Sequence, residues 1–399
     1  MTLPKLDDLD VRGKVVLIRS DLNVPLADGE VADDSRIRAT APTIARILDR
    51  GGRAVVIAHL GRPKGEPDPD FSLRPVGDAL CRALSGRRVR FAPDCIGSEA
   101  EKAVSDLSDG ECVLLENLRF HPGEKENDPA FADALASLGD LYVNDAFSAA
   151  HRAHASIVGL AERLPSAAGD LMASELAALE RLLSEPKQPY MALLGGAKIG
   201  TKIGVIDALL DRADRIMLGG VMANTFLKAR GDDTGRSQVA DDEVDEARRL
   251  LERAGQNKIM LPVDAVVAGD IRESEPRAVG IPGIPGDAMI LDIGPETIRS
   301  FVDALGPDGT VVWNGPLGAA EYEPFEHGTL QLARAIAERT KDRRLASVVG
   351  GGETVAFLYK HDLQDRFSHV SLAGGAFLKW LSGAPLPGVE ALRKAKERT

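Results

Sequence analysis

Four arginines in the first half of the chain stand in polar motifs at expected strand ends or loops. They are Arg36, Arg62, Arg119 and Arg152. The planar guanidinium fork pairs with the oxygens of a phosphate or carboxylate, so arginines that converge form a strong anion site. A single arginine is more often a solvated surface charge. Four at strand ends favour a common anionic ligand.

Other polar side chains in this half suit a small hydroxylated acid. Asp21 and Asn23 alternate along an extended segment, where they can accept from and donate to hydroxyl groups. The same pair also suits a turn before the following proline. His59 and His151 can complement an anion when protonated, and we assign both to the anion site. His154 is left unassigned.

The second half offers glycines and lysines instead. Residues 195–202 read Gly-Gly-Ala-Lys-Ile-Gly-Thr-Lys, which is not a Walker A loop because that loop needs its lysine before the hydroxyl residue. Lys198 and Lys202 are four residues apart, so a helix that begins here would place both ammonium groups near its positive end, which suits polyphosphate.

A second glycine-rich segment, residues 350–354, reads Gly-Gly-Gly-Glu-Thr. Its backbone N–H groups can approach a phosphate, and the carboxylate of Glu353 can hold Mg²⁺. A glycine run alone is also typical of a tight turn.

These residues need elements that bring them to common edges. Short apolar runs alternate with helical stretches, which predicts βαβ units and buried parallel sheets. Nearly every run ends in polar residues or glycines, and ligands of open α/β sheets bind at the carboxyl ends of strands. The runs are Val15–Ile18, Ala54–Ala58, Val113–Leu115, Leu141–Val143, Met191–Leu194, Ile216–Leu218, Met289–Leu291, Val311–Trp313 and Ser347–Val349. We interpret the first half as acid-binding and the second as nucleotide-binding.

Length and periodicity predict two domains joined by a helix. The chain has 399 residues, more than one hydrophobic core usually supports. Met172, Leu176, Leu179 and Leu183 recur at helical spacing between the two halves. We therefore expect an amphipathic linking helix there.

Composition excludes several classes of protein. A net charge of −12 argues against nucleic-acid or anionic-membrane partners, and no apolar run is long enough for a membrane span. The N-terminal residues lack a signal or transit pattern, so a cytoplasmic location is expected. The three cysteines, Cys81, Cys95 and Cys112, lack C-x-x-C spacing, so neither disulfides nor structural zinc are expected.

Eight motifs, in order along the whole chain, are similar to those of the phosphoglycerate kinase family. They are Arg19–Pro25, His59–Pro63, Leu115–Phe120, Val143–Phe147 with His151–His154, Gly195–Lys198, Leu291–Pro295, Val312–Pro316 and Gly350–Gly352. The resemblance implies an α/β fold of two Rossmann-like lobes, each a parallel sheet flanked by helices, joined by a helix across a central cleft. It also implies reversible phosphoryl transfer from 1,3-bisphosphoglycerate to ADP, giving 3-phosphoglycerate and ATP, with Mg²⁺ as cofactor and a monomeric enzyme.

The resemblance implies domain boundaries and residue roles. Residues 1–168 would bind 3-phosphoglycerate, 169–186 would form the interdomain helix, 187–372 would bind nucleotide, and 373–399 would return to the first domain. The acid would be held by Asp21, Asn23, Arg36, His59, Arg62, Arg119, His151 and Arg152. Arg36, Lys202, Gly374 and Gly375 would face the transferred phosphoryl group. Nucleotide contacts would come from Gly196, Lys198, Lys202, Gly219, Gly220, Asn314, Pro316, Glu321, Gly350, Gly351, Gly352, Glu353 and Thr354, with Glu321 at the ribose and Glu353 at the metal.

The sequence departs from the family pattern in four ways. Leu372-Ala373 replaces a Thr-Gly pair, Lys379 replaces a glutamate, Val221 a glycine and Glu353 an aspartate. We expect Val221 to narrow the adenine pocket. Leu372 offers no hydroxyl, and Ala373 resists the positive φ that glycine adopts freely, which together predict an active enzyme with a reduced kcat and nearly normal KM values.

Two alternatives follow. The first is a kinase-like protein that binds nucleotide with weak or lost turnover. The second is a Rossmann dehydrogenase, which the missing G-x-G-x-x-G fingerprint argues against.

Overall fold

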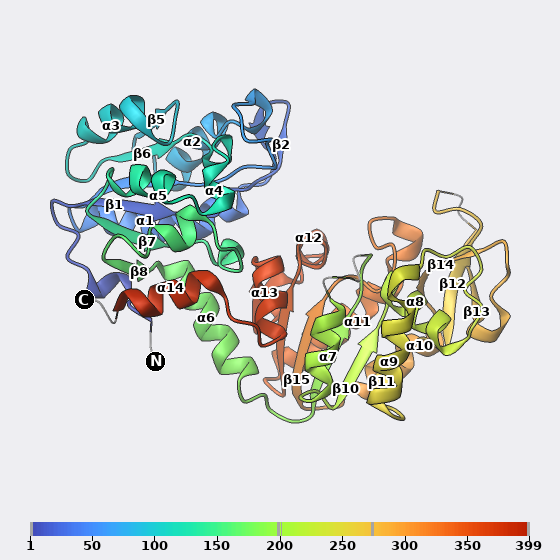
Figure 1. Ribbon diagram of the computed structural model, residues 1–399. Helices are drawn as coiled ribbons and strands as arrows, with labels where there is room; N and C mark the ends of the chain where they lie inside the picture. The colour runs from blue at the N-terminus through green and yellow to red at the C-terminus, as the bar shows by residue number, and fades with distance from the viewer. Residues whose placement is uncertain (1–2, 198–199, 201, 273–274, 397–399) are drawn as a thin grey trace. The chain divides into compact units, whose positions relative to one another are not determined.

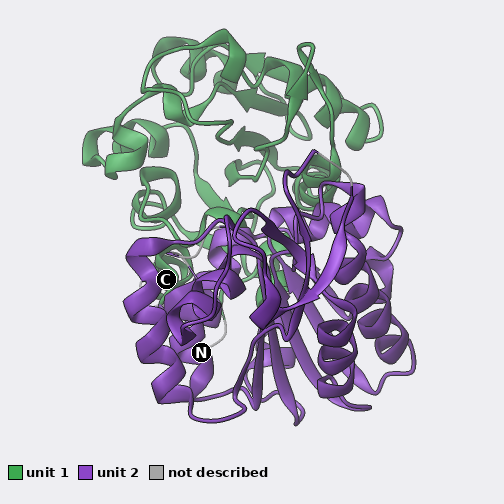
Figure 2. Cartoon of the chain, turned by 90° about the vertical axis from the view of Figure 1, so that its right-hand side faces the viewer, with its two compact units in different colours: residues 1–177, 385–399 green, residues 178–384 purple. Residues whose placement is uncertain are grey.

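The computed structural model describes residues 3–197, 200, 202–272 and 275–396. The chain divides into two compact units: unit 1 comprises residues 1–177 and 385–399, and unit 2 comprises residues 178–384 (Figure 2). Each unit contains a six-stranded parallel sheet, so each builds its own core. The predicted α/β class with two parallel sheets is confirmed. Among the described residues, none of the helices combines the length and apolarity needed to cross a bilayer.

The sheet of unit 1 has the strand order β5-β6-β4-β1-β7-β8. Its strands are β1 (Val15–Arg19), β4 (Arg53–Ile57), β5 (Val89–Ala92), β6 (Cys112–Leu115), β7 (Leu141–Asn144) and β8 (Ser166–Ala168). Every residue of β1, β6 and β7 is buried, as expected for parallel strands covered on both faces. A short antiparallel hairpin, β2 (Leu26–Ala27) and β3 (Glu30–Val31), follows β1.

Helices pack on this sheet (Figure 1). Apolar side chains from the helices and the sheet form the core of unit 1. The α-helices are α1 (Ser35–Asp49), α2 (Arg74–Ala83), α3 (Gly97–Ser105), α4 (Gly123–Glu126), α5 (Pro129–Ala136) and α14 (Pro387–Lys396). Short turns of helix are η1 (Leu6–Asp8), η2 (Pro69–Phe71), η3 (Leu118–Phe120), η4 (Phe147–Ala149) and η5 (Ala155–Gly159). Ile18 of β1, Ile44 of α1 and Val56 of β4 are fully buried in one cluster.

Unit 2 has two sheets. The parallel sheet runs β11-β10-β9-β15-β16-β17 and the antiparallel one β13-β12-β14. The strands are β9 (Tyr190–Leu194), β10 (Arg215–Leu218), β11 (Ile259–Met260), β12 (Asp264–Ala268), β13 (Arg277–Gly280), β14 (Met289–Ile293), β15 (Gly309–Asn314), β16 (Leu345–Gly350) and β17 (His369–Ser371). The prediction that residues 289–291 join a parallel sheet is wrong, because β14 pairs antiparallel to β12.

Seven α-helices lie within unit 2 among the described residues: α7 (Ile203–Leu210), α8 (Gly220–Arg230), α9 (Val244–Ala254), α10 (Pro295–Ala304), α11 (His327–Lys341), α12 (Gly352–Lys360) and α13 (Gly374–Leu381). Short turns of helix are η6 (Asp241–Glu243), η7 (Ile281–Gly283), η8 (Glu323–Phe325) and η9 (Gln364–Arg366). The core centres on Trp313 of β15, which is fully buried with Met191 of β9 and Leu332 of α11.

The chain passes from unit 1 to unit 2 along α6 (Asp170–Leu183) and returns near its end. The return begins at residue 385, whereas the sequence placed it at 373. The reason is that α13 packs against α7 and β16 of unit 2, so only α14 rejoins unit 1, against η5 and β8 (Figure 1).

A buried carboxylate holds the start of α6 within unit 1. Asp145, at the end of β7, accepts hydrogen bonds through Oδ1 from the backbone N–H groups of Leu171 (2.9 Å) and Met172 (3.2 Å). Its Oδ2 accepts from the Thr40 hydroxyl at 3.1 Å. Burial raises the pKa of Asp145 to about 7.

Replacing Asp145 with asparagine should therefore stabilise the protein more at about pH 8 than at about pH 5, by on the order of 2–3 kcal/mol. The folded-state pKa lies above the ordinary 3.8, so the unfolded chain releases the proton first and wild-type stability falls as the pH rises from about 4 to about 7. The asparagine oxygen still accepts from α6 but never ionises. Urea titrations at both pH values measure the difference, with the exposed Asp109→Asn as control. A pH-independent difference contradicts the prediction.

Candidate functional site

Polar residues that follow β1 in unit 1 meet the first turn of α1. Arg36 of α1 forms an ion pair with Asp21, whose side chain is only 7% exposed. The Ser148 hydroxyl donates to the same carboxylate oxygen of Asp21. The structure thus brings together two residues that the sequence assigned to the acid site, and leaves the Arg36 side chain 28% exposed.

A second group of predicted residues meets at Gly61, after β4. The Asn23 Oδ1 accepts from the Gly61 N–H at 2.8 Å, and the Arg119 Nη1 donates to the Gly61 carbonyl at 2.5 Å. Arg119 is 3% exposed, and its Nε and Nη2 are buried without a hydrogen-bond partner in the part of the chain that the structure describes. Buried guanidinium donors left unpaired are costly, so they point to an anionic ligand.

The remaining predicted residues of unit 1 lie within electrostatic reach of this group. Burial, and then the nearby Arg152 and Arg19, lower the pKa of Arg119 to about 10. Burial, and then Arg62 and Arg19, lower the pKa of Arg152. The Arg152 Nε lies 3.2 Å from the His151 Nε2, and Arg62 is exposed. A concentration of positive charge that depresses arginine pKa values is one that an anion would relieve.

Three buried residues of unit 1 were not assigned from the sequence: Arg19, Glu124 and Ser156. Arg19 ends β1 and is 1% exposed; it contacts His59 and Ser156. Arg19 opens one of the family motifs, which is the signal that could have found it. Glu124 and Ser156 carried no such signal, because neither stands at a strand end.

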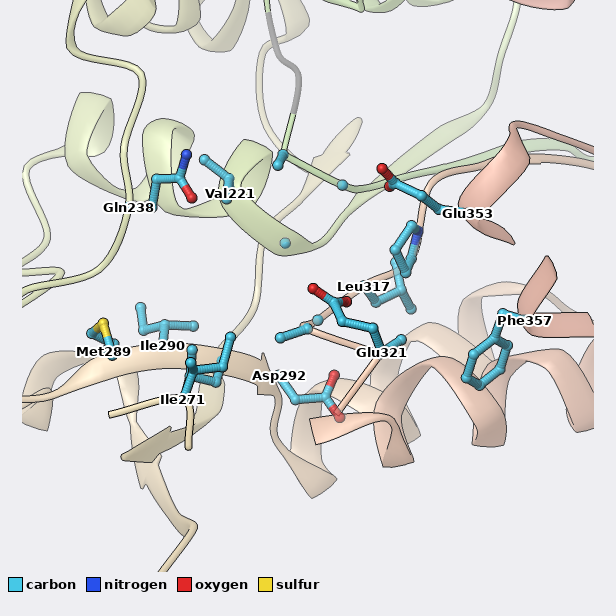
Figure 3. Close-up of a pocket in the computed structure, with 18 of the residues that line it drawn as sticks. Val221, Gln238, Ile271, Met289, Ile290, Asp292, Leu317, Glu321, Glu353 and Phe357 are labelled. Atoms are coloured by element: carbon cyan, nitrogen blue, oxygen red, sulfur yellow. The ribbon is translucent and has the colours of Figure 1, made fainter. Parts of the chain in front are cut away.

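Unit 2 contains a cavity of about 890 Å³ with an apolar body and acidic side chains (Figure 3). Figure 3 shows Val221 and Gln238 on one side of it and Ile271, Met289 and Ile290 on the other. Five predicted nucleotide residues line it: Gly196, Gly220, Pro316, Glu321 and Glu353. An apolar cavity with a few polar groups suits a nucleobase and ribose.

Glycines let two backbone segments approach beside this cavity. A Cβ on Gly315, which has a φ of +94°, would lie 2.1 Å from the Gly195 carbonyl oxygen and 2.7 Å from the Lys202 Nζ. Any side chain at Gly315 would therefore displace the lysine. Gly219 is equally constrained, since its Cβ would lie 2.7 Å from the Leu317 Cα.

Lys202 precedes α7 and is 7% exposed, with its ammonium donating to the Gly195 carbonyl. The first residue of α7 is Ile203, so Lys202 lies before the helix. Lys198 lies outside the described residues. The expectation that Lys202 lies on a helix face is therefore wrong, and the placement of Lys198 beside it stays a prediction.

The ends of β15 and β16 are tied to each other by the predicted residues themselves. The Asn314 Nδ2 donates to the Gly350 carbonyl at 2.8 Å, and the Gly315 N–H donates to the Thr354 hydroxyl at 2.8 Å. A Cβ on Gly351, with a φ of +101°, would lie 2.8 Å from the Asn314 Nδ2. Glu353, in the first turn of α12, stays exposed at the cavity edge.

The expectation that Ala373 is strained is wrong. Ala373 immediately precedes Gly374 and Gly375, the first residues of α13, with a φ of −99°, and its N–H donates to the Ser371 hydroxyl at 3.2 Å. This backbone conformation is open to any residue, so glycine is not required there.

Ala373→Gly should accordingly leave kcat within about twofold of the wild type, and should lower the free energy of unfolding by about 0.5–1 kcal/mol because glycine gains more freedom in the unfolded chain. Steady-state kinetics and urea unfolding measure the two quantities. A clear rise in kcat would mean that alanine does impede the turn.

Known proteins resemble the chain along almost its whole length. A family model described as Phosphoglycerate kinase matches residues 6–384. The chain is 50% identical over 400 residues to the phosphoglycerate kinase of Sinorhizobium medicae (strain WSM419), covering 99% of this chain and 100% of that relative. It is 52% identical over 396 residues to that of Rhizorhabdus wittichii (strain DSM 6014 / CCUG 31198 / JCM 15750 / NBRC 105917 / EY 4224 / RW1), covering 98% and 100%.

Solved structures agree with the sequence relatives. Phosphoglycerate kinase from Coxiella burnetii matches with a TM-score of 0.86 at 38% identity, covering 98% of this chain and 99% of that one. Phosphoglycerate kinase from Pyrococcus horikoshii OT3 matches with a TM-score of 0.88 at 30% identity, covering 100% of both chains. With cationic strand ends in one unit and an apolar, glycine-bordered cavity in the other, the chain belongs to the phosphoglycerate kinase family.

Proposed function

We propose that unit 1 binds 3-phosphoglycerate or 1,3-bisphosphoglycerate, that unit 2 binds ADP or ATP, and that the protein transfers a phosphoryl group reversibly between them. The observation that carries the acid site is Arg119, a buried guanidinium with two unpaired nitrogens beside Gly61. The nucleotide site is supported by the predicted nucleotide residues that line the cavity of unit 2. Family membership supplies the reaction.

The chemistry suits the residues present. In the direction that consumes ATP, the acceptor is a carboxylate that is already ionised at neutral pH, so no general base is needed. Catalysis can rest on positioning and on positive charge around the moving phosphoryl group. Arg36 would supply that charge from the acid side and Lys202 from the nucleotide side.

Glu353 is the residue that we propose for Mg²⁺. Its carboxylate is exposed at the edge of the cavity, and its Oε2 lies 3.6 Å from where a Cβ of Gly196 would stand. A free carboxylate oxygen at this place fits a hard cation carried by a nucleotide. Bound Mg²⁺ would neutralise charge on the phosphate oxygens.

We also propose a monomer in the cytoplasm. The acidic net charge of −12 supports the absence of nucleic-acid and anionic-membrane partners. Light scattering on the purified protein, with and without nucleotide, tests the oligomeric state.

A coupled assay that follows ATP consumption with and without 3-phosphoglycerate tests the proposed function. We expect consumption that requires the acid and Mg²⁺. If ADP and ATP bind but no acid-dependent turnover appears, the alternative of a nucleotide-binding protein without turnover is the better description.

A further inference from the structure

His59 is buried among positive charges in unit 1. It is 7% exposed, and the charged or titratable groups that act on it are Arg19, Arg119, Arg152 and His154. These come from the end of β1, from η3 and from the loop before η5. Burial, and then the charge of Arg19, lower the pKa of His59 well below its usual value.

The contact between Arg19 and His59 fixes the direction of a hydrogen bond. The Arg19 Nη2 lies 2.8 Å from the His59 Nδ1. A guanidinium nitrogen can only donate, so the Nδ1 must accept and carry no proton. A neutral ring with a bare Nδ1 holds its proton on the Nε2. In the described residues the Nε2 has no hydrogen-bond partner, so its N–H stays available.

A second, fully buried group fixes Arg19 itself. The Arg19 Nε donates to the Ser156 hydroxyl at 2.9 Å, and that hydroxyl donates to the Glu124 Oε1 at 2.6 Å. The Ser156 N–H donates to the other Glu124 oxygen at 2.9 Å. Glu124 and Ser156 are both fully buried, so Glu124 supplies the negative charge that offsets Arg19 in the interior.

We infer that Glu124, Ser156 and Arg19 form a buried hydrogen-bonded relay that fixes His59 as a neutral, Nε2-protonated donor to the acid ligand. The inference rests on the proposed binding of the acid by unit 1. In this arrangement the arginines supply the charge that binds the ligand, and the hydrogen bond donated by His59 orients it. Arg19, Ser156 and Glu124 are positioning residues, since they act through His59.

Imidazole nitrogen NMR of the full-length wild type tests the tautomer directly, with the His59 signal assigned by its loss in His59→Gln. We expect a bare Nδ1 and a protonated Nε2 from about pH 8 down to about pH 5.5, with and without 3-phosphoglycerate. A ring that takes up a second proton near the ordinary pKa, or one protonated on the Nδ1, overturns the inference. This measurement needs no turnover, so it stands apart from any failure of the proposed function.

Ser156→Ala tests the relay, because it separates Arg19 from Glu124 without removing either charge. We expect the KM for 3-phosphoglycerate to rise about five- to tenfold, with the KM for ATP within about twofold and a mixed tautomer at His59. The matched control is Ser166→Ala, a buried serine of β8 whose hydroxyl donates to the Leu164 carbonyl. An unchanged KM for the acid and an unchanged tautomer in Ser156→Ala overturn the relay.

Arg19→Lys keeps the charge but loses the fork that reaches both Ser156 and His59. We expect it to raise the KM for the acid at least as much as Ser156→Ala does. If Arg19→Lys keeps the wild-type KM for the acid and the wild-type tautomer of His59, a positive charge at residue 19 is enough to fix His59, and the relay is wrong. Should the buried lysine prevent folding, the wild-type NMR and Ser156→Ala still decide the question.

Discussion

Replacing Arg36 with alanine is expected to lower kcat roughly a thousandfold while leaving the affinity for ADP within about twofold of the wild type. Arg36 lies in the first turn of α1, where its side chain is 28% exposed and paired with Asp21. In the proposed reaction its charge stabilises the phosphoryl group mainly during transfer, and the proposed nucleotide residues lie in the other unit. The loss should therefore appear in kcat, with a smaller rise in the KM for the acid.

A matched control stands two residues along the same helix. Arg38 also pairs with an aspartate, Asp34, but its side chain is 63% exposed. Arg38→Ala should leave kcat and both KM values nearly unchanged, since an exposed ion pair contributes little. Calorimetric titration with ADP and thermal unfolding of both variants show whether Arg36→Ala stays folded. A folded Arg36→Ala variant with near wild-type kcat would contradict the proposed role of Arg36 in phosphoryl transfer.

Runs of apolar residues predicted the central strands well but not the directions of all of them. Residues 311–313 lie in β15, at the centre of the parallel sheet, as expected. Residues 289–291 have an equally apolar sequence, yet β14 pairs antiparallel to β12. A run of apolar side chains indicates burial on both faces, but says nothing of the direction of the neighbouring strand.

The edge strands β5 and β8 could not be predicted from the sequence, for a different reason. β5 is only partly buried and contains Arg90, which donates to the Asp106 carbonyl and to Glu111 at the surface. β8 is three small residues long. Neither offers the apolar run that marks a central strand, because β5 is only partly buried and β8, although buried, is too short.

Residues of the candidate site could be proposed from the sequence where they follow strands, and less easily where their proposed role depends on a partner far away in the chain. His59 and Arg119 stand in motifs that end a strand, so position alone indicated them. The importance of Arg19 depends on Ser156, which lies 137 residues away in sequence. No local pattern links the two. Ala373 was misjudged because a family glycine does not by itself mean a positive φ, and the observed φ is −99°.

Lys202→Ala is expected to lower kcat by roughly a hundredfold or more, with ADP affinity changed far less. The ammonium donates to the Gly195 carbonyl beside the cavity proposed for the nucleotide, and the space for the ammonium exists because Gly315 has no side chain. A Cβ on Gly315 would lie only 2.7 Å from the Lys202 Nζ, so little space is left around the ammonium. Lys202→Arg should therefore fail to restore kcat, because a guanidinium is larger than the space beside Gly315 and would disturb the glycine backbone around it.

Lys228→Ala is the control for this last experiment, since Lys228 is an exposed lysine of unit 2 that pairs with Asp241. Rapid-quench measurements of a single turnover separate the phosphoryl-transfer step from product release, and calorimetry gives the Kd for ADP. If Lys202 acts on the moving group, the single-turnover rate falls with kcat while the Kd stays close to that of the Lys228→Ala variant. A fall in ADP affinity that accounts for the whole loss would instead make Lys202 a nucleotide-binding residue, and the charge at the transition state would have to come from elsewhere.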